Sequence, residues 1–364
     1  MARKNSGKVT ITDVAKQAGV STATAGRVLG GYGYTSSKIK DQVFESAKKL
    51  GYQPNSLARS LITGKTNTIG VVAGDIQSPF YSTILRGISD VLRRHHYGVL
   101  LTNSDEVLAQ EMDAVRLLQE KQVDGLIVAP CDKSEQSHLV KVVEGGCPVI
   151  QIDRIVPGLE ADSVTLNNRQ AAKECIRTLI KAGHKRIGLI AELELLTEGD
   201  LRSIAEGVIS SELDSSAYFP SWQRFFGYVE AHLEEGLAVD YSLIGRVGAY
   251  SKELAKEKTT SLLTRNDRPT ALFTTDGLLS AVAMETITQL NLSIPEDLSL
   301  VCFDDLDWMS FLKPGISAIA QPLYEMGYES AMLMMQRIED RHAPYRHVCL
   351  SATMLKRGSV APLT

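Results

Sequence analysis

Residues 9–31 read VTITDVAKQAGVSTATAGRVLGG, and this stretch contains two short helix patterns separated by a glycine. Thr10 precedes apolar residues at helical spacing, and its hydroxyl can cap the first turn of a helix. Gly19 ends that helix, and Ser21 is placed to cap a second one. The pattern therefore predicts two short helices joined by a tight turn.

Further helix signals follow directly. The glycine-rich stretch GGYGYTSS at 30–37 predicts a loop, after which Thr35 or Ser36 can cap a third helix that ends before Gly51. A proline then opens a short fourth segment, residues 55–61. Because the second helix begins with small polar residues, it can enter the major groove of DNA. The N-terminal residues thus predict an all-α helix-turn-helix head.

Charge is distributed unevenly along the chain. Residues 1–65 carry eleven Lys and Arg against three acidic residues, a net charge of +8, whereas the whole chain carries −4. The remaining residues therefore carry −12. A basic head on an acidic body predicts a polyanion as partner of the head alone, since the body would be repelled from it.

From Thr68 onward the pattern becomes one of alternating strands and helices. Two amphipathic segments of helix length are 80–96 and 110–121. Seven apolar runs have strand character: IGVVAG at 69–74, YGVLLTN at 97–103, GLIVAP at 125–130, PVIQID at 148–153, RIGLIA at 186–191, ALFTTD at 271–276 and LSLVCFDD at 298–305. Such alternation predicts parallel sheets covered by helices on both faces, and the length accommodates two of them. A ligand is expected in the cleft beyond the strand ends.

Composition excludes several classes of protein. With 364 residues, 44% hydrophobic and 23% charged, the chain is neither disordered nor collagen-like. No apolar run reaches the roughly eighteen residues of a membrane span, and the basic N-terminus has no apolar stretch behind it. We therefore expect a cytoplasmic protein that does not contact a membrane.

Cysteine and histidine spacing argues against metal sites and catalysis. The five cysteines are scattered without a CxxC pair, so we expect buried reduced thiols and neither disulfides nor a metal. The seven histidines have no partner motif. IGVVAGDIQSPF lacks the glycine fingerprint of a dinucleotide site, so no cofactor is expected and the protein is not expected to be an enzyme.

The stretch 9–31, together with KIKDQVFESAKKLGYQPNSLARSLITGKTNTIGVV at 38–72, strongly resembles the N-terminal signature of the LacI/GalR family. Further segments extend this resemblance nearly to the C-terminus: DIQSPFYSTILRGI, VDGLIVAP, PVIQIDR, IKAGHKRIGLI and IPEDLSLVCFDD. It implies a homodimeric transcription factor that binds a pseudo-palindromic operator in double-stranded DNA. It also implies a periplasmic-binding-protein-like core, built from two doubly wound parallel-sheet subdomains, that senses a small molecule.

Domain boundaries follow from the same resemblance. We expect a helix-turn-helix domain over 1–54, a hinge helix and linker over 55–66, and a ligand-binding core over 67–362. Within the core, the N-subdomain is expected to comprise about 67–165 and 321–350, and the C-subdomain about 166–320 and 351–362.

The resemblance also assigns DNA-contacting residues. Thr22, Ala23 and Arg27 occupy base-reading positions, and Arg27 can grip a guanine at two points. Tyr34 matches a further contact position that can reach a base or a phosphate. The positions that match phosphate contacts are Thr10, Ser21, Thr24 and Asn55, although Ser21 could act as a helix cap alone. Leu61 falls where the family places an apolar wedge in the minor groove, a role that rests on the resemblance because a leucine would otherwise be interpreted as core.

The head departs from the family at three positions. Ala25-Gly26 stands where the family usually has Val-Ser, and Gly30 where it has Asn. A glycine inside a helix costs roughly 1 kcal/mol. We expect an unusually flexible loop after the second helix, and an operator preference that differs from that of common members.

Nine residues are candidates for ligand binding: Asp75, Phe80, Tyr81, Asp153, Trp222, Arg224, Thr275, Asp304 and Trp308. Phe80 and Tyr81 follow the first core strand, where rings can stack on a sugar or base, although aromatic residues at a helix start are often core. Arg224 matches the family's ligand-gripping arginine. The two tryptophans are expected to form an aromatic wall.

The acidic candidates leave alternatives open. Asp153 and Asp304 each end a strand and can accept from ligand hydroxyls, but Asp304 could instead pair with Arg224 or Arg154. Asp75 could equally cap a helix, and Thr275, where the family has Asn, shortens the polar reach. Aromatic rings beside acids and an arginine favour a carbohydrate or glycoside over a purine. A long acidic, serine-rich connection over 192–221 is expected to overhang the cleft.

Several functional alternatives remain at this point. Inducer-responsive and corepressor-responsive members share these residues, since both work by changing the cleft and with it the hinge. Some relatives take a phosphoprotein as partner. A solute-binding protein would share the core but carry a signal peptide and no basic head. The C-terminus KRGSVAPLT lacks the heptads of a tetramer, so a dimer is expected.

Overall fold

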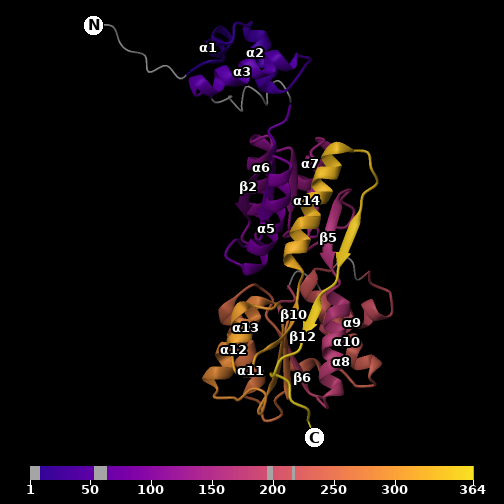
Figure 1. Ribbon diagram of the computed structural model, residues 1–364. Coiled ribbons are helices and arrows are strands. Elements are labelled where there is room, and N and C mark those ends of the chain that lie inside the picture. The colour runs from indigo at the N-terminus through magenta and orange to yellow at the C-terminus, as the bar shows by residue number, and fades with distance from the viewer. Residues whose placement is uncertain (1–8, 53–63, 195–199, 215–217, 364) are drawn as a thin grey trace, which may run out of the picture. The chain divides into compact units, whose positions relative to one another are not determined.

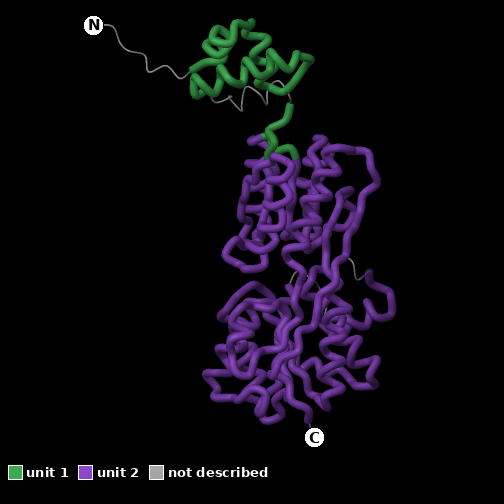
Figure 2. Tube along the Cα trace, in the orientation of Figure 1, with its two compact units in different colours: residues 1–68, 122–124 green, residues 69–121, 125–364 purple. Residues whose placement is uncertain are grey.

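The structure is a computed structural model that describes residues 9–52, 64–194, 200–214 and 218–363. The chain divides into two compact units, one of residues 1–68 and 122–124 and the other of residues 69–121 and 125–364 (Figure 2). The first unit contains the helical head. The second contains both sheets.

Three helices form the head: α1 (Ile11–Gln17), α2 (Thr22–Gly30) and α3 (Ser37–Leu50). Thr10 and Ser21 cap α1 and α2 as predicted, and Ser36 is the N-cap of α3. The helices bury a small apolar core of Val14, Ala15, Ala18, Ala25, Val28, Val43 and Ala47. The predicted fourth segment, 55–61, lies outside the described residues.

The first sheet has six strands in the order β11-β5-β4-β3-β1-β2. Its strands are β1 (Thr68–Ala73), β2 (Gly98–Asn103), β3 (Gly125–Val128), β4 (Val149–Ile152), β5 (Asp162–Leu166) and β11 (His347–Leu350). Four helices accompany them: α5 (Pro79–Arg94), α6 (Leu108–Glu120), α7 (Ser137–Glu144) and α14 (Leu323–Glu339). The pairs β1/β3, β3/β4, β4/β5 and β5/β11 are parallel.

The second sheet has six strands in the order β12-β10-β9-β8-β6-β7. Figure 1 labels three of them, β6, β10 and β12. Its strands are β6 (Ile187–Ala191), β7 (Ile244–Arg246), β8 (Ala271–Thr274), β9 (Ser299–Phe303), β10 (Ser317–Ala320) and β12 (Thr353–Leu355). The helices are α8 (Asn168–Lys181), α9 (Leu201–Ile209), α10 (Pro220–Glu234), α11 (Lys252–Leu263), α12 (Gly277–Gln289) and α13 (Asp307–Phe311), with a 3-10 turn at Tyr241–Leu243. In this sheet β12 runs antiparallel to β10, whereas the pairs β10/β9, β9/β8, β8/β6 and β6/β7 are parallel.

The predicted architecture of a helical head and two parallel-sheet subdomains is confirmed. All seven predicted strands are present, within two residues of the expected limits. Five further strands were not predicted: β5, β7, β10, β11 and β12. Two of these, β11 and β12, are exposed or half-buried along their length, so they lack the continuous apolar run that marks a central parallel strand.

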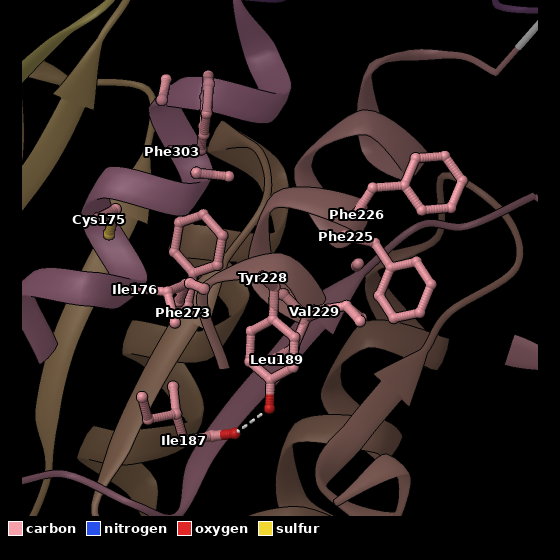
Figure 3. Close-up of a cluster of buried hydrophobic side chains, with 14 of the residues drawn as sticks. Cys175, Ile176, Ile187, Leu189, Phe225, Phe226, Tyr228, Val229, Phe273 and Phe303 are labelled. Carbon is pink, nitrogen blue, oxygen red and sulfur yellow. Dashed lines mark hydrogen bonds between the residues drawn. The ribbon is translucent and has the colours of Figure 1, made fainter. Parts of the chain in front are cut away.

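The second sheet buries its two faces in separate apolar clusters, because successive side chains of a strand point to opposite faces. One face packs on α8 and α10, where Phe225, Phe226 and Tyr228 meet Phe273 and Phe303 (Figure 3). The buried Tyr228 hydroxyl donates a hydrogen bond of 2.7 Å to the carbonyl oxygen of Ile187. The other face packs on α11, α12 and α13.

A pair of helices crosses closely beside the first sheet. A methyl group at Gly327 of α14 would lie 1.9 Å from the carbonyl oxygen of Ile84 in α5, and one at Gly87 of α5 would lie 2.2 Å from the carbonyl oxygen of Tyr324. Glycine is required at both positions, since any side chain there would force the two backbones apart.

The chain passes between the two sheets three times. The passages follow β5 at Asn167, β10 at residues 321–322 and β11 at residues 351–352. Asn167 connects the first passage to the third: its N–H donates to Leu350 O at 2.9 Å, and its Oδ1 accepts from Ala352 N at 2.9 Å.

Two predictions from the sequence concern membrane-spanning helices and the cysteines. No helix of the described ranges is long and apolar enough to cross a membrane. The five cysteines all lie in the described ranges and form no disulfide there, but only Cys175 and Cys302 are buried. The prediction of burial is wrong for Cys349, which is exposed because it lies on β11, the strand at the end of the first sheet.

Candidate functional site

The exposed face of α2 carries the predicted base-reading residues. Thr22, Ala23 and Arg27 are exposed, whereas Ala25 and Val28 of the same helix are buried in the head core. The helix therefore divides between one face that holds it to α1 and α3 and another that is open to solvent. An exposed arginine among small side chains can approach base edges without obstruction.

Hydrogen bonds order the beginning of α2. Ser21 Oγ accepts from the N–H of Thr24 at 3.1 Å and lies 2.9 Å from Thr24 Oγ1. Arg27 Nη2 lies 3.5 Å from the same Thr24 hydroxyl. Thr10 caps α1 in the same way: its Oγ1 accepts from the N–H of Asp13 at 3.4 Å, and its hydroxyl donates to Asp13 Oδ2 at 2.7 Å. Ser21 and Thr10 are thus helix caps, and a phosphate contact would be a second role for each.

The loop after α2 presents Tyr34, whose surface is 95% exposed. Its glycines predicted an unusually flexible loop, but backbone hydrogen bonds join the loop to the end of α2. The N–H of Tyr32 donates to Arg27 O at 3.1 Å, and Gly31 caps α2 in the left-handed conformation. The remaining DNA candidates, Asn55 and Leu61, lie outside the described residues.

Two predicted acids occupy equivalent positions in the two sheets. Asp153 follows β4 and Asp304 follows β9, and both adopt left-handed backbone angles, with φ of 68° and 73°. Non-glycine residues in this conformation are uncommon and concentrate at functional sites. We call the region around these two residues the inter-sheet site.

Asp153 is buried without full hydrogen bonding. Its Oδ1 has no hydrogen-bond partner within the described residues, and its Oδ2 lies 3.6 Å from Arg154 Nε. Burial raises the pKa of Asp153, and the nearby charge of Asp304 raises it further while Arg154 opposes the shift. A buried, unpaired carboxylate oxygen is costly unless a ligand or water satisfies it.

Asp304 is held by the first residue of α12 and by the passage between the sheets at residues 321–322. Its Oδ2 accepts from the N–H of Gly277 at 2.9 Å, and its Oδ1 accepts from Gln321 Nε2 at 2.5 Å. Among the described ion pairs, none joins Asp304 to Arg224 or Arg154, so the alternative of a salt bridge is not what the structure shows. Each oxygen of Asp304 thus has one donor from the protein, and a carboxylate oxygen can accept a second hydrogen bond.

Arg224 lies on α10 and is only 5% exposed. Its Nε donates to Asn168 Oδ1 at 2.8 Å, its Nη1 donates to the carbonyl oxygen of Thr275, and its guanidinium lies 3.7 Å over the ring of Phe303. Burial lowers the pKa of Arg224, while Asp304 and Asp153 oppose that shift. Thr275 is fully buried, and its hydroxyl has no partner in the described chain.

The first sheet contributes a linked set of polar side chains. The hydroxyl of Tyr81 donates to Glu106 Oε1 at 3.0 Å, and Glu106 also pairs with Arg154. Phe80 packs edge-on against Tyr81, with ring centroids 4.9 Å apart. Tyr81 is therefore buried and engaged, whereas Phe80 is half-buried. Asp75 does not cap α5: its Oδ1 accepts from Gln77 N in the preceding turn, and Ser78 is the N-cap.

Two family comparisons match separate parts of this architecture. The family described as "Bacterial regulatory proteins, lacI family" matches residues 10–55, and "Periplasmic binding proteins and sugar binding domain of LacI family" matches residues 66–357. The chain belongs to the LacI family. It is a transcriptional regulator with a helix-turn-helix DNA-binding head and a sugar-binding-type core, as the sequence resemblance indicated.

Similar proteins share almost the full length of this LacI-family chain. The HTH-type transcriptional repressor CytR of Escherichia coli K12 is 31% identical over 100% of this chain and 99% of its own, and Catabolite control protein A of Priestia megaterium is 30% identical over 90% and 91%. These relatives are regulators rather than enzymes. The lac repressor dimer bound to operator and an anti-inducer has the same fold, with a TM-score of 0.77 and 22% identity over 98% of this chain and 100% of that one.

The predicted aromatic wall of Trp222 and Trp308 is wrong. Trp222 is fully buried among Tyr218, Phe225 and Phe226 on one face of the second sheet. Trp308 is half-buried against the cluster on the opposite face. The two indoles are separated by the sheet because α10 and α13 cover different sides of it, a fact of topology that local sequence does not reveal.

The connection over 192–221 contains a helix and an aromatic end that contacts the first-sheet side. Much of it is the helix α9, whose Ala205 and Val208 are buried in the core of the second sheet. Its end does reach the first-sheet side, since Lys133 lies 4.5 Å from the Tyr218 ring and Arg154 lies 5.1 Å from the Phe219 ring. Both aromatic residues belong to the acidic, serine-rich stretch that was expected to overhang the cleft.

Sequence reasoning missed several charged members of the inter-sheet site. Burial raises the pKa of Glu192 to about 7 and that of Asp276 to about 6. Arg154 lowers the pKa of Glu192, which places the two side chains in one electrostatic environment. Both acids end or follow predicted strands, β6 and β8, so the rule that selected Asp153 and Asp304 also points to them.

Proposed function

We propose that this LacI-family regulator is a ligand-responsive repressor. It binds a pseudo-palindromic operator as a homodimer, and a small carbohydrate in a cleft between the two sheets releases or tightens it through the hinge. The observation that carries the DNA part is the exposed Thr22, Ala23 and Arg27 face of a helix whose other face is buried. The excess positive charge of residues 1–65 supplies attraction to phosphates.

We propose the following division of labour along the chain: residues 1–54 read DNA, 55–66 form the hinge, and 67–362 form the sensor. In the sensor, about 67–165 with 321–350 form one subdomain and about 166–320 with 351–362 the other. A protein that acts on operator DNA works in the cytoplasm, and we propose that location for this chain.

The proposed effector site is the inter-sheet site. Asp153 Oδ1 and the Thr275 hydroxyl have no hydrogen-bond partner among the described residues, and both suit a ligand rich in hydroxyl groups. Asp304 offers a further acceptor and Arg224 a planar set of donors. A LacI-family regulator of Enterococcus faecium, 27% identical over 82% of this chain with a TM-score of 0.66, was solved with bound ribose, which supports a carbohydrate here.

An apolar surface beside the first sheet supports the homodimer. The last strand of that sheet, β2, exposes Leu100 and Leu101, and Ile76 nearby is 51% exposed. A hollow lined by Ile76, Leu85 and Leu101 adjoins them. Unpaired, apolar end strands invite association, and a second copy of the chain would cover this one.

The experiment combines DNA selection with ligand screening. Purified full-length protein is offered a duplex library with two randomised half-sites at increasing salt, and separately a thermal-shift panel of pentoses, hexoses, glycosides and nucleosides. We expect enrichment of a palindrome, and a rise in melting temperature with at least one sugar. Failure to prefer any palindrome over scrambled DNA would refute the repressor role. A shift by nucleosides alone would refute the carbohydrate.

A further inference from the structure

The loop that follows α2 contains Tyr32, whose side chain packs against two glycines of that helix. A methyl group at Gly30 would lie 2.4 Å from Cε1 and 2.7 Å from Cδ1 of the Tyr32 ring, far inside van der Waals contact. Four residues earlier on the same face of α2, a methyl group at Gly26 would lie 3.6 Å from the Tyr32 hydroxyl. The ring therefore lies flat along the last turn of α2, and Gly30 is the residue that makes room for it.

Backbone contacts hold the loop in this position. Gly31 ends α2 in the left-handed conformation with its N–H on Val28 O, and the N–H of Tyr32 donates to Arg27 O at 3.1 Å. Gly33 is also left-handed, with φ of 74°. The chain thus folds back over the helix, and the ring and these bonds fix the direction in which it returns.

The returning loop reaches the side chain that reads DNA. A methyl group at Gly33 would lie 3.2 Å from Cδ and 3.7 Å from Cγ of Arg27, so the bare backbone of Gly33 lies against the arginine stem. On the helix itself, Thr24 Oγ1 lies 3.5 Å from Arg27 Nη2. The exposed Arg27 is confined between these two neighbours, although an isolated surface arginine would sample many rotamers.

We propose that Tyr32 is a positioning residue for operator recognition. By packing on Gly30 it fixes the loop, and through Gly33 the loop limits the conformations of Arg27, so that the guanidinium is presented in one direction to its base pair. Ordering before binding favours the correct geometry, because fewer rotamers are lost on contact. This proposal rests on the proposed DNA-reading function and adds to it a residue that acts through Arg27.

The first experiment locates the base pair that Arg27 reads. The palindrome selected by the wild-type protein is mutated one base pair at a time, and discrimination is measured as the ratio of dissociation constants for wild type and Arg27→Ala. If the wild-type protein selects no palindrome, the repressor function has failed, and the role of Tyr32 falls with it. If it does, the base pair whose preference disappears with Arg27→Ala becomes the readout.

Substitutions at Tyr32 then test the positioning role. We expect Tyr32→Ala to lower discrimination at that base pair by roughly tenfold, as a partial loss of a two-point contact would. Non-specific, salt-dependent binding should be retained. Tyr32→Phe should restore discrimination, because the ring rather than the hydroxyl packs on Gly30. Unchanged preference in Tyr32→Ala, or a Tyr32→Phe variant as impaired as Tyr32→Ala, would overturn the proposal.

A double substitution separates positioning from simple loss of stability. Gly30→Ala should impair discrimination by displacing the ring, but it should add nothing in a Tyr32→Ala background, where no ring is present. Equal effects in the two backgrounds would contradict the proposal. Tyr52→Ala removes a ring of the same kind from the head core and serves as the control for destabilisation. If that variant lost the same base preference, the effect would be one of stability and the proposal would be wrong.

Discussion

A buried ion pair beside the first sheet allows the loss of stability on a single substitution to be predicted. Asp162, at the start of β5, accepts from Arg337 Nε at 2.8 Å and from Nη2 at 3.0 Å. The two side chains are only 2% and 7% exposed. The carboxylate also accepts from the N–H of Arg346 at 2.8 Å, so it ties α14 and the approach to β11 to β5. Asp162→Asn preserves the size of the side chain and removes its charge.

The loss in free energy of unfolding expected for Asp162→Asn depends on the burial of the pair and on the hydrogen bonds that Arg337 keeps. Breaking a buried pair by removing one partner costs about 3–5 kcal/mol, since an uncompensated charge is left behind. Arg337 keeps carbonyl partners at Ala343, Pro344 and Arg341, so the lower end of that range applies. We expect a loss of about 3 kcal/mol, which is on the order of a hundredfold in the unfolding equilibrium.

The matched control is a second two-point Arg–Asp pair with the same chemistry and more solvent. Arg357 Nη1 and Nη2 donate to Asp305 Oδ1 and Oδ2 at 2.6 and 2.9 Å, but the side chains are 21% and 25% exposed. Asp305→Asn should cost no more than about 1 kcal/mol. Urea unfolding followed by circular dichroism measures both. The reasoning is refuted if Asp162→Asn costs less than about 1 kcal/mol, or no more than Asp305→Asn.

Three further outcomes are expected. Arg27→Ala should weaken the preference for one operator base pair by roughly tenfold or more, and fluorescence anisotropy at matched salt would contradict this if all base pairs weakened equally. Burial raises the pKa of Glu192 to about 7, so the folded state binds the extra proton and ionisation destabilises it as pH rises from about 4.5 to about 7. Glu192→Gln should therefore gain stability relative to wild type across that window, and a constant difference in free energy of unfolding would exclude this. Tyr228→Phe leaves the Ile187 carbonyl without its buried donor, at a cost of about 1 kcal/mol in the same urea assay; an unchanged midpoint would contradict it.

Local patterns predicted the elements that depend on local interactions. Thr10 and Ser21 could be assigned as caps because a cap bonds to residues two or three positions away. The central strands were evident because strands buried on both faces need continuous apolar runs. β11 escaped because its partner β5 lies about 180 residues earlier, and a short, exposed strand leaves no periodic signal.

In the candidate site, too, residues marked by local sequence could be predicted and contacts between distant residues could not. Asp153 and Asp304 were predictable because each follows an apolar run. The contact of Arg154 with Glu106 was not, since the two are 48 residues apart and Glu106 reaches its place through a left-handed backbone angle of 56°. Trp222 shows the reverse error: a large aromatic near an arginine was interpreted as a ligand platform, but it is fully buried, with Tyr218, Phe225 and Phe226 packed against it.

The hydrogen bonds of Asn167 have a mechanical consequence. These bonds join the first passage between the sheets to the third, so the two passages act as one connection. The passage at residues 321–322 is the second connection. Two connections between the sheets hinder rotation least about the line that passes through both of them. Through its backbone N–H and its side chain, Asn167 therefore reduces three separate connections to two, and we expect rotation about the line through these two to be the easiest relative movement of the two sheets.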